Sequence, residues 1–517
     1  QVPLAQDEQR FNEPQVLNTQ MVKYHMRIAF IGAGSVGFTQ KLVRDILTVP
    51  ELQETEFFLQ DISQDNLEMV KQLLEKDISA NGLPAKVLSA TDRAEALAGA
   101  KYVINCSRIG GLEAFRHDIE IPLKYGVDQC VGDTVCAGGI LYGQRSIPAI
   151  LDFCEDIRSY AETDVLFLNY ANPMAMNTWA ALDYGKVNTI GLCHGVQGGA
   201  KLISEVLGVE NPKDLEYVCS GINHMTWYIQ LKLRGRSIDK AELLEAFRRH
   251  PKYSNQEKVR IDVLERFGIF STESNGHLSE YLPWYRKRPE EINSWIDLSD
   301  WIHGETGGYL RVCTERRNWF EDDFPRWLDQ AGLPLEQYER STEHCSYIIE
   351  AQETGRVYRG HFNTKNNGVI KNLPDDCIIE STGFVDLFGM HMASGIELPM
   401  GCASACRTSI DVQRMSVEAA MNGDVDLLKL AVLHDPLVGA VCSPEEVWAM
   451  VDEMLIAQAQ WLPQYEEAIE PARQRLSKNT IKTRTWTGAA RKKVRNVAEL
   501  KEDVHASLMV EDDAFQP

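Results

Sequence analysis

A glycine-rich turn near the start of the chain constrains the fold more than any other feature. Gly32, Gly34 and Gly37 form a G-x-G-x-x-G string between the apolar run 28–31 and the amphipathic stretch 38–47. A strand, a glycine turn and a helix in this order are typical of the first βα step of a doubly wound sheet. The N-terminal part of the chain is therefore predicted to be an α/β sheet domain.

Each residue type in this string has a physical task. Gly32 allows a tight turn, Gly34 lets the backbone approach a pyrophosphate, and the helix N-terminus supplies N–H donors. Asp61 ends the next apolar run, 24 residues beyond Gly37, where it would accept hydrogen bonds from ribose hydroxyls. We expect Gly32, Gly34, Gly37 and Asp61 to bind NAD rather than NADP.

Alternating strand and helix patterns extend the first unit to about residue 195. The predicted strands lie at 86–90, 102–106, 165–170 and 189–193. The fold class is therefore α/β, an N-terminal Rossmann-like doubly wound parallel sheet with a C-terminal mixed α+β domain, similar to lactate and malate dehydrogenases. The predicted parts are a leader or expression-derived segment (1–25), an NAD-binding domain (26–195), a substrate- and metal-binding domain (196–463) and a C-terminal extension (464–517).

Composition excludes several partner classes. Lys and Arg number 53 against 75 Asp and Glu, so the net charge of −22 makes nucleic acid an unsuitable partner. No apolar run reaches the length of a membrane span. Twelve cysteines without framework spacing favour a reducing, cytoplasmic compartment. The stretch 473–498 holds nine basic and no acidic residues, which is typical of a solvated tail or of an arm on an acidic neighbouring subunit.

Several polar strings follow or lie near the predicted strands. They are GDT (132–134), NYANPM (169–174), GLCHG (191–195), GINH (221–224) and TESNGH (272–277). In an open α/β sheet the ligand crevice lies at the carboxyl ends of the strands, so these strings are expected to converge. Cys193 and His224 would suit a transition metal with open coordination positions, although a single Cys or His is more often a packed residue.

Taken together, the ordered strings resemble glycoside hydrolase family 4, the glycosidases that use NAD and a divalent metal. The resemblance covers about residues 27–463 and is closest to the melibiase-type α-galactosidase branch. The segments that carry it are IGAGSVGF, IGGLE, GDTVCAGGI, NYANPMAMNTW, GLCHGVQG, GINHMTWYI, TESNGHLSEYLPWY, NNGVIKNLPDD and LHDPLVGAV.

The resemblance implies an unusual hydrolysis. NAD takes a hydride from carbon 3 of the sugar, a base removes the acidified proton at carbon 2, and the metal, expected to be manganese, stabilises the resulting enediolate. The aglycone then leaves, water adds and the hydride returns, so NAD is not consumed. Family 4 stands outside the usual two-carboxylate mechanism. A homodimer or homotetramer is also implied.

The resemblance assigns metal and sugar ligands residue by residue. Cys193 and His224 match the family's metal ligands. Asn172 and Asp133 match positions that hydrogen-bond the sugar hydroxyls.

The acid and base are assigned less directly, because the family varies around TESNGHLSEY. Tyr281 is the candidate base, since a nearby cation lowers the pKa of a phenol. Glu273 is the candidate acid, and His194 is expected to touch the sugar or assist proton transfer. His277 is an alternative, and each of these side chains has a purely structural interpretation as well.

Two departures from the branch pattern concern the substrate. The string Cys193-His194-Gly195 replaces the usual CHS and is similar to that of branches acting on α-glucosides and α-glucuronides. Arg108 stands where glutamine is usual, and a guanidinium suits a bidentate anion. Arg108 is therefore a candidate ligand for an anionic sugar such as an α-glucuronide or α-galacturonide, unless it pairs with an internal acid.

The sequence thus predicts an NAD- and manganese-dependent α-glycosidase. A neutral α-galactoside is the first choice of substrate, and an anionic α-glycoside is the alternative. Two other classes share the fold type: a 2-hydroxyacid dehydrogenase, which would release NADH without a metal, and a catalytically silent NAD-binding regulator.

Overall fold

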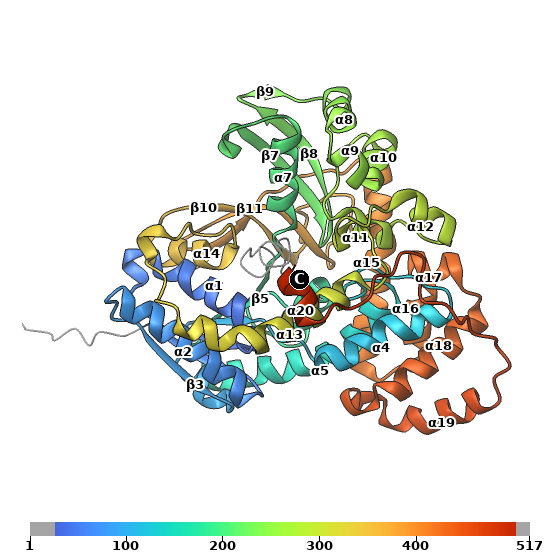
Figure 1. Cartoon of the computed structure of the whole chain (residues 1–517), viewed down its shortest axis with the longest axis horizontal. Helices are drawn as coiled ribbons and strands as arrows, with labels where there is room; N and C mark the ends of the chain where they lie inside the picture. The colour runs from blue at the N-terminus through green and yellow to red at the C-terminus, as the bar shows by residue number, and fades with distance from the viewer. Residues whose placement is uncertain (1–25, 503–517) are drawn as a thin grey trace, which may run out of the picture.

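Six parallel strands form the first part of one central sheet, in the order β3-β2-β1-β4-β5-β6 (Figure 1). In this computed structural model, which describes residues 26–502, these strands are β1 (Arg27–Ile31), β2 (Glu56–Gln60), β3 (Lys86–Ala90), β4 (Tyr102–Asn105), β5 (Leu166–Asn169) and β6 (Thr189–Gly191). The order is that of a doubly wound dinucleotide-binding sheet, which confirms the predicted fold class. The predicted leader, 1–25, lies outside the described residues.

The strands form where the sequence has short continuous apolar runs. In β1 and β2 four of the five residues are buried, as expected of strands covered on both faces by helices. These helices are α1 (Val36–Leu47), α2 (Gln64–Ala80), α3 (Arg93–Leu97), α4 (Gly111–Lys124), α5 (Cys136–Tyr160), α6 (Met174–Asp183) and α7 (Gly195–Val206).

The sheet continues into the second part of the chain by antiparallel pairing. Gly191 of β6 pairs with Asn363 of β10, and the order goes on through β11, β7, β8 and β9, with β12 beside β11. These strands are β7 (Leu215–Ile222), β8 (Met225–Leu233), β9 (Arg236–Ser237), β10 (Tyr358–Lys365), β11 (Ile378–Asp386) and β12 (Gly389–Met392). The sheet therefore runs across the division at residue 195, and the two-domain division remains a prediction.

The largest apolar core also joins the two parts. It unites Ile140 of α5 and Trp179 of α6 with Ile410 of α15 and Met450 of α18. The helices of the second part are α8 (Lys240–Arg249), α9 (Tyr253–Gln256), α10 (Lys258–Phe267), α11 (Asn275–Tyr281), α12 (Pro289–Trp295), α13 (Gly308–Asp329), α14 (His344–Thr354), α15 (Met400–Asn422), α16 (Val425–His434), α17 (Pro436–Val441), α18 (Pro444–Ala457), α19 (Glu466–Ser477) and α20 (Val497–Glu502). Within residues 26–502, none of the helices is long and apolar enough to cross a bilayer.

The end of the described chain returns to the body of the molecule. This C-terminal arm, residues 478–502, runs from α19 back to α20 beside α13 (Figure 1). Its Arg484 N–H donates to the Lys124 carbonyl at 2.7 Å, and its Arg495 guanidinium lies 2.9 Å from Glu315. The basic stretch is thus not a free tail, since several of its positive charges, among them Arg491 and Arg495, pair with acidic residues of their own chain.

Candidate functional site

The glycine turn after β1 has the geometry that a dinucleotide requires. Gly32 has φ +79°, and a Cβ there would lie 2.5 Å from the backbone of Ser107. The Gly34 N–H donates to Asp61 Oδ2 at 2.8 Å, and a Cβ on Gly34 would meet that same oxygen at 2.7 Å. A Cβ on Gly37 would meet no protein atom within 4 Å. The first two positions exclude side chains because the backbone is crowded, whereas Gly37 faces open space.

The start of α1 leaves its donors available. Ser35 makes no side-chain capping bond there, and the first turn of the helix carries no acidic residue. The N–H groups and the positive dipole end of the helix therefore suit a pyrophosphate. Asp61 accepts from Gly34 and, through Oδ1, from the Ser63 N–H at 2.9 Å, and each carboxylate oxygen keeps a lone pair for a ribose hydroxyl. These residues fit a bound dinucleotide.

A thiol, an imidazole and a carboxylate meet where three separate segments end. Cys193 follows β6, His224 lies in the turn between β7 and β8, and Glu273 precedes α11. One ligand atom from each lies within 4.8 Å of the other two, and His224 Nε2 is 3.8 Å from Glu273 Oε2. A soft, a borderline and a hard donor together fit a divalent transition metal.

The pKa values of the three side chains in this cluster favour the binding of a cation. Burial lowers the pKa of His224 to about 4, which keeps its imidazole neutral at neutral pH. Burial raises the pKa of the Cys193 thiol well above its usual value, so the thiolate needs a cation beside it. For Glu273, burial opposes ionisation but the imidazoles around it outweigh that effect and lower its pKa. His224 also has φ 62°, a costly conformation for a residue other than glycine and one that clusters at functional sites.

The predicted sugar ligands lie together in a second group. Asp133 is fully buried and accepts from Thr134 Oγ1 at 2.9 Å and from Asn172 Nδ2 at 3.4 Å. Its Oδ2 also lies 3.0 Å from the guanidinium of Arg108. The sequence left two partners open for Arg108, an anionic sugar and an internal acid. The structure provides the internal acid, Asp133. Three aromatic rings surround the guanidinium, at 4.6 Å (Phe115), 5.2 Å (Tyr142) and 5.3 Å (Tyr309) from its carbon.

The predicted base and acid have different surroundings. The Tyr281 hydroxyl donates to the Asn223 carbonyl at 3.1 Å, and burial raises its pKa well above the usual value. Glu273, the candidate acid, lies in the metal-ligand cluster itself. His194 Nδ1 is 3.5 Å from the buried carboxylate of Glu343. The structure therefore brings Glu273 and Cys193 together, and it commits the Tyr281 hydroxyl to a backbone acceptor.

Three carboxylates near the site were not identified from the sequence. Glu343 contacts His194, Glu380 lies 3.4 Å from Asn223 Nδ2, and Glu280 lies 2.5 Å from His277 Nδ1. Glu280 could have been found, because it is three residues from His277 on one helix and so shares its face. Glu343 and Glu380 come from distant segments that carry no local signal.

A dinucleotide turn after β1 and a thiol–imidazole–carboxylate cluster formed after β6, between β7 and β8 and before α11 are typical of a dinucleotide-binding enzyme with a metal centre. Residues 27–209 match the family described as Family 4 glycosyl hydrolase, and residues 219–438 match its C-terminal domain. The chain belongs to glycoside hydrolase family 4, which confirms the predicted family and makes the protein a glycoside hydrolase.

Two relatives and one solved structure illustrate the similarity. An α-galactosidase of Rhizobium meliloti (strain 1021) is 65% identical over 93% of this chain and 98% of its own length. An α-galactosidase of Bacillus subtilis (strain 168) is 35% identical over 85% of this chain and 100% of its own. The 6-phospho-β-glucosidase of Thermotoga maritima, solved with manganese, NAD⁺ and glucose-6-phosphate, is 24% identical with a TM-score of 0.69, covering 84% of this chain and 99% of that one. This last comparison supports the fold alone.

Proposed function

We propose that this chain is an α-galactosidase that depends on NAD and on a divalent metal, with manganese as the expected ion. The observation that carries the proposal is the cluster of Cys193, His224 and Glu273, in a chain whose first glycine turn fits a dinucleotide. The two α-galactosidase relatives match 93% and 85% of this chain over 98% and 100% of their own lengths. They therefore support the same substrate class.

When bound, NAD supplies a hydride acceptor for carbon 3 of the sugar and the divalent metal supplies a Lewis acid beside its oxygens. The chain's own residues then position the sugar and move protons. We assign the sugar hydroxyls to Asp133 and Asn172, which contact each other at 3.4 Å; the neighbouring Thr134 lies 3.3 Å from His224. Cys193 and His224 hold the metal, and Glu273 lies within reach of both.

Proton transfer at carbon 2 needs a group that can accept a proton. The sequence analysis predicts Tyr281 as this base, but its hydroxyl donates its proton to the Asn223 carbonyl. Among the contacts that the structure describes for this hydroxyl, none is a donor that could stabilise the phenolate form. The carboxylate of Glu273 is therefore the better base, which leaves His194, paired with Glu343, as the acid toward the leaving group.

The charge balance around Arg108 favours a neutral sugar over an anionic one. Asp133 lies 3.0 Å from the guanidinium and neutralises it inside the protein. A second anion on the sugar would have to compete with this internal partner. An α-galactoside is thus preferred to an α-galacturonide or α-glucuronide.

The function is tested with a panel of aryl α-galactoside, α-glucoside and α-galacturonide, assayed with manganese, NAD and a reductant. We expect fastest hydrolysis of the α-galactoside, no net NADH, and no activity in chelator. Full activity in the presence of chelator would contradict the proposed dependence on a divalent metal. Oxidation of a 2-hydroxyacid with NADH release would instead indicate the dehydrogenase class, and binding of NAD without any turnover would indicate the regulator.

Two further expectations accompany the function. All twelve cysteines are free, as suits a reducing, cytoplasmic location. We infer a homodimer or homotetramer, which sedimentation would test.

A further inference from the structure

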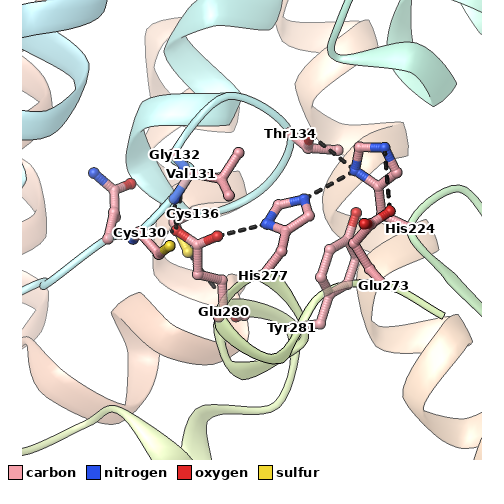
Figure 2. Close-up of polar contacts among 12 residues, drawn as sticks. Cys130, Val131, Gly132, Thr134, Cys136, His224, Glu273, His277, Glu280 and Tyr281 are labelled. Carbon is pink, nitrogen blue, oxygen red and sulfur yellow. Dashed lines mark hydrogen bonds and ion pairs between the residues drawn. The ribbon is translucent and has the colours of Figure 1, made fainter. Parts of the chain in front are cut away.

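The metal-ligand candidate His224 is held from behind by a second histidine. Its Nε2 faces Glu273 at 3.8 Å, whereas its Nδ1 lies 2.9 Å from Nε2 of His277 (Figure 2). Thr134 Oγ1 also approaches His224 Nδ1, at 3.3 Å. The two ring nitrogens of His224 therefore have separate tasks: one faces the cluster and the other is bound within the protein.

The contact chain continues from His277 to a buried carboxylate. Glu280 Oε2 lies 2.5 Å from His277 Nδ1, and the two residues share one face of α11 because they are three positions apart. Glu280 is fully buried and His277 is almost so. Figure 2 shows the unbroken line of contacts from Glu280 through His277 to His224 and on to Glu273.

The other oxygen of Glu280 binds a loop of the sugar site. Oε1 accepts the backbone N–H groups of Cys130, Val131 and Gly132 at 2.9, 3.1 and 3.1 Å. This loop leads directly into Asp133. Three backbone donors thus fix one oxygen of Glu280, and its other oxygen faces His277.

These contacts permit only one direction of hydrogen bonding that leaves His224 ready for a metal. In that direction Glu280 accepts, His277 donates from Nδ1, and Nε2 of His277 accepts. His224 must then donate from Nδ1, which leaves the lone pair of its Nε2 facing Glu273 and Cys193. Thr134 agrees with this direction, because its hydroxyl proton goes to Asp133 at 2.9 Å and its oxygen remains free to accept.

We propose that His277 and Glu280 are positioning residues that fix the tautomer and ring orientation of His224 and tie this metal ligand to the loop that carries Asp133. The inference rests on the metal site of the proposed function and goes beyond it, because neither residue belongs to the cluster of Cys193, His224 and Glu273. Partners of this kind commonly change metal affinity by about 10- to 100-fold when they are replaced.

Glu280→Gln is the sharpest test because it keeps the shape and reverses the hydrogen bonding. The three backbone N–H groups hold the amide oxygen, so the amide NH₂ donates to His277 Nδ1. His277 must then donate from Nε2, and His224 carries its proton on Nε2, where it blocks the metal. We expect Mn²⁺ affinity, measured by electron paramagnetic resonance of free Mn²⁺, to fall by about tenfold or more, with NAD affinity unchanged.

A second readout does not need the metal. Imidazole ¹⁵N NMR of the chelated protein should show His224 protonated at Nδ1 in the wild type and at Nε2 in Glu280→Gln. His277→Phe, which removes the acceptor altogether, should also weaken Mn²⁺ binding and so covers the case in which Glu280→Gln fails to fold.

Ser279→Ala is the matched control. Ser279 is fully buried on the same helix and bonds the Gly276 carbonyl and Arg286, but it lies outside the contact chain. We expect it to leave Mn²⁺ affinity and the His224 tautomer unchanged. Equal Mn²⁺ affinity in wild type and in folded Glu280→Gln would overturn the positioning role, whereas absence of Mn²⁺ binding in the wild type would instead contradict the proposed function.

Discussion

Arg108 and Asp133 form an ion pair at the proposed sugar site, with a guanidinium nitrogen 3.0 Å from a fully buried carboxylate oxygen. The pair joins the loop after β4 to the loop before α5. The pair has two consequences. Asp133 neutralises the guanidinium, so that an arginine is compatible with a neutral sugar, and Arg108 in turn holds Asp133 in position for the sugar hydroxyls.

Replacing Arg108 should lower activity without changing the preferred sugar. Arg108→Gln leaves Asp133 buried without its counter-charge. For a fully buried pair this lowers the free energy of unfolding by about 3 to 5 kcal/mol. Arg108 keeps 20% of its side chain exposed, so we expect a smaller effect, about tenfold in kcat/KM. The ratio of kcat/KM for α-galactoside over α-galacturonide should stay above one in both proteins. A wild-type preference for the uronide that disappears in Arg108→Gln would restore the anionic alternative.

Loss of the thiol should separate cofactor binding from turnover. Cys193→Ser removes the soft ligand of the cluster but leaves the glycine turn and Asp61 untouched. We expect NAD affinity, measured by fluorescence titration, to be retained and hydrolysis to be lost even with excess manganese. Chelation should likewise abolish wild-type turnover, and manganese should restore it. A fully active Cys193→Ser enzyme would remove this residue from the metal site.

Isotope exchange should identify the base. If a proton leaves carbon 2, turnover in heavy water places deuterium there in the released sugar. Because the Tyr281 hydroxyl donates to the Asn223 carbonyl, we expect Tyr281→Phe to keep measurable exchange and Glu273→Gln to abolish it. The opposite pattern would make Tyr281 the base, as the sequence proposed.

Glu380 should make the metal-free protein less stable as the pH rises. Burial raises its pKa from the ordinary value to about 8. The folded state then holds a proton that the unfolded state has released, so stability falls with increasing pH between about 4.5 and 8 and levels off above. Urea unfolding of chelated wild type and Glu380→Gln, at about pH 5 and about pH 9, should show the wild type losing stability relative to the variant. A constant difference would mean that Glu380 ionises normally.

Removing the C-terminal arm should weaken the support of the sugar site. The Ala489 N–H donates to Asp128 Oδ2 at 2.8 Å, and Asp128 also binds the buried Arg286 at 3.0 Å. Truncation after Ser477 should therefore lower the melting temperature and raise KM for the galactoside. Truncation after Glu502 keeps the whole arm and serves as the control. Equal melting temperatures and KM values for the two truncations would show that the arm is dispensable.

Local sequence patterns predicted the parallel half of the sheet because its signals are local. The run 28–31, the glycine turn and Asp61 lie within one βαβ unit, and the structure has each where it was expected. The continuation of the sheet could not be predicted, since Gly191 pairs with Asn363, which is remote in sequence. Cys193 and His224 were predicted from the resemblance to glycoside hydrolase family 4, because their separation in the sequence is not itself typical of a metal site.

The second set of carboxylates shows the same limit. Glu280 shares a helix face with His277 and was within reach of a pattern argument, whereas Glu343 reaches His194 only through tertiary packing. The packing of the basic stretch could not be predicted for the same reason. Two of its acidic partners, Glu120 and Glu315, are far away in the sequence and carry no local signal.

The contact between Ala489 and Asp128 spans 361 residues of sequence. On the ribosome, the loop that leads to Asp133 is therefore synthesised long before its last support exists. A nascent chain that stalls before the arm has emerged would carry both cofactor-binding segments with an incompletely braced sugar pocket. Fusion partners and tags placed inside the arm would impose the same defect on the finished protein, whereas those placed beyond Glu502 would not.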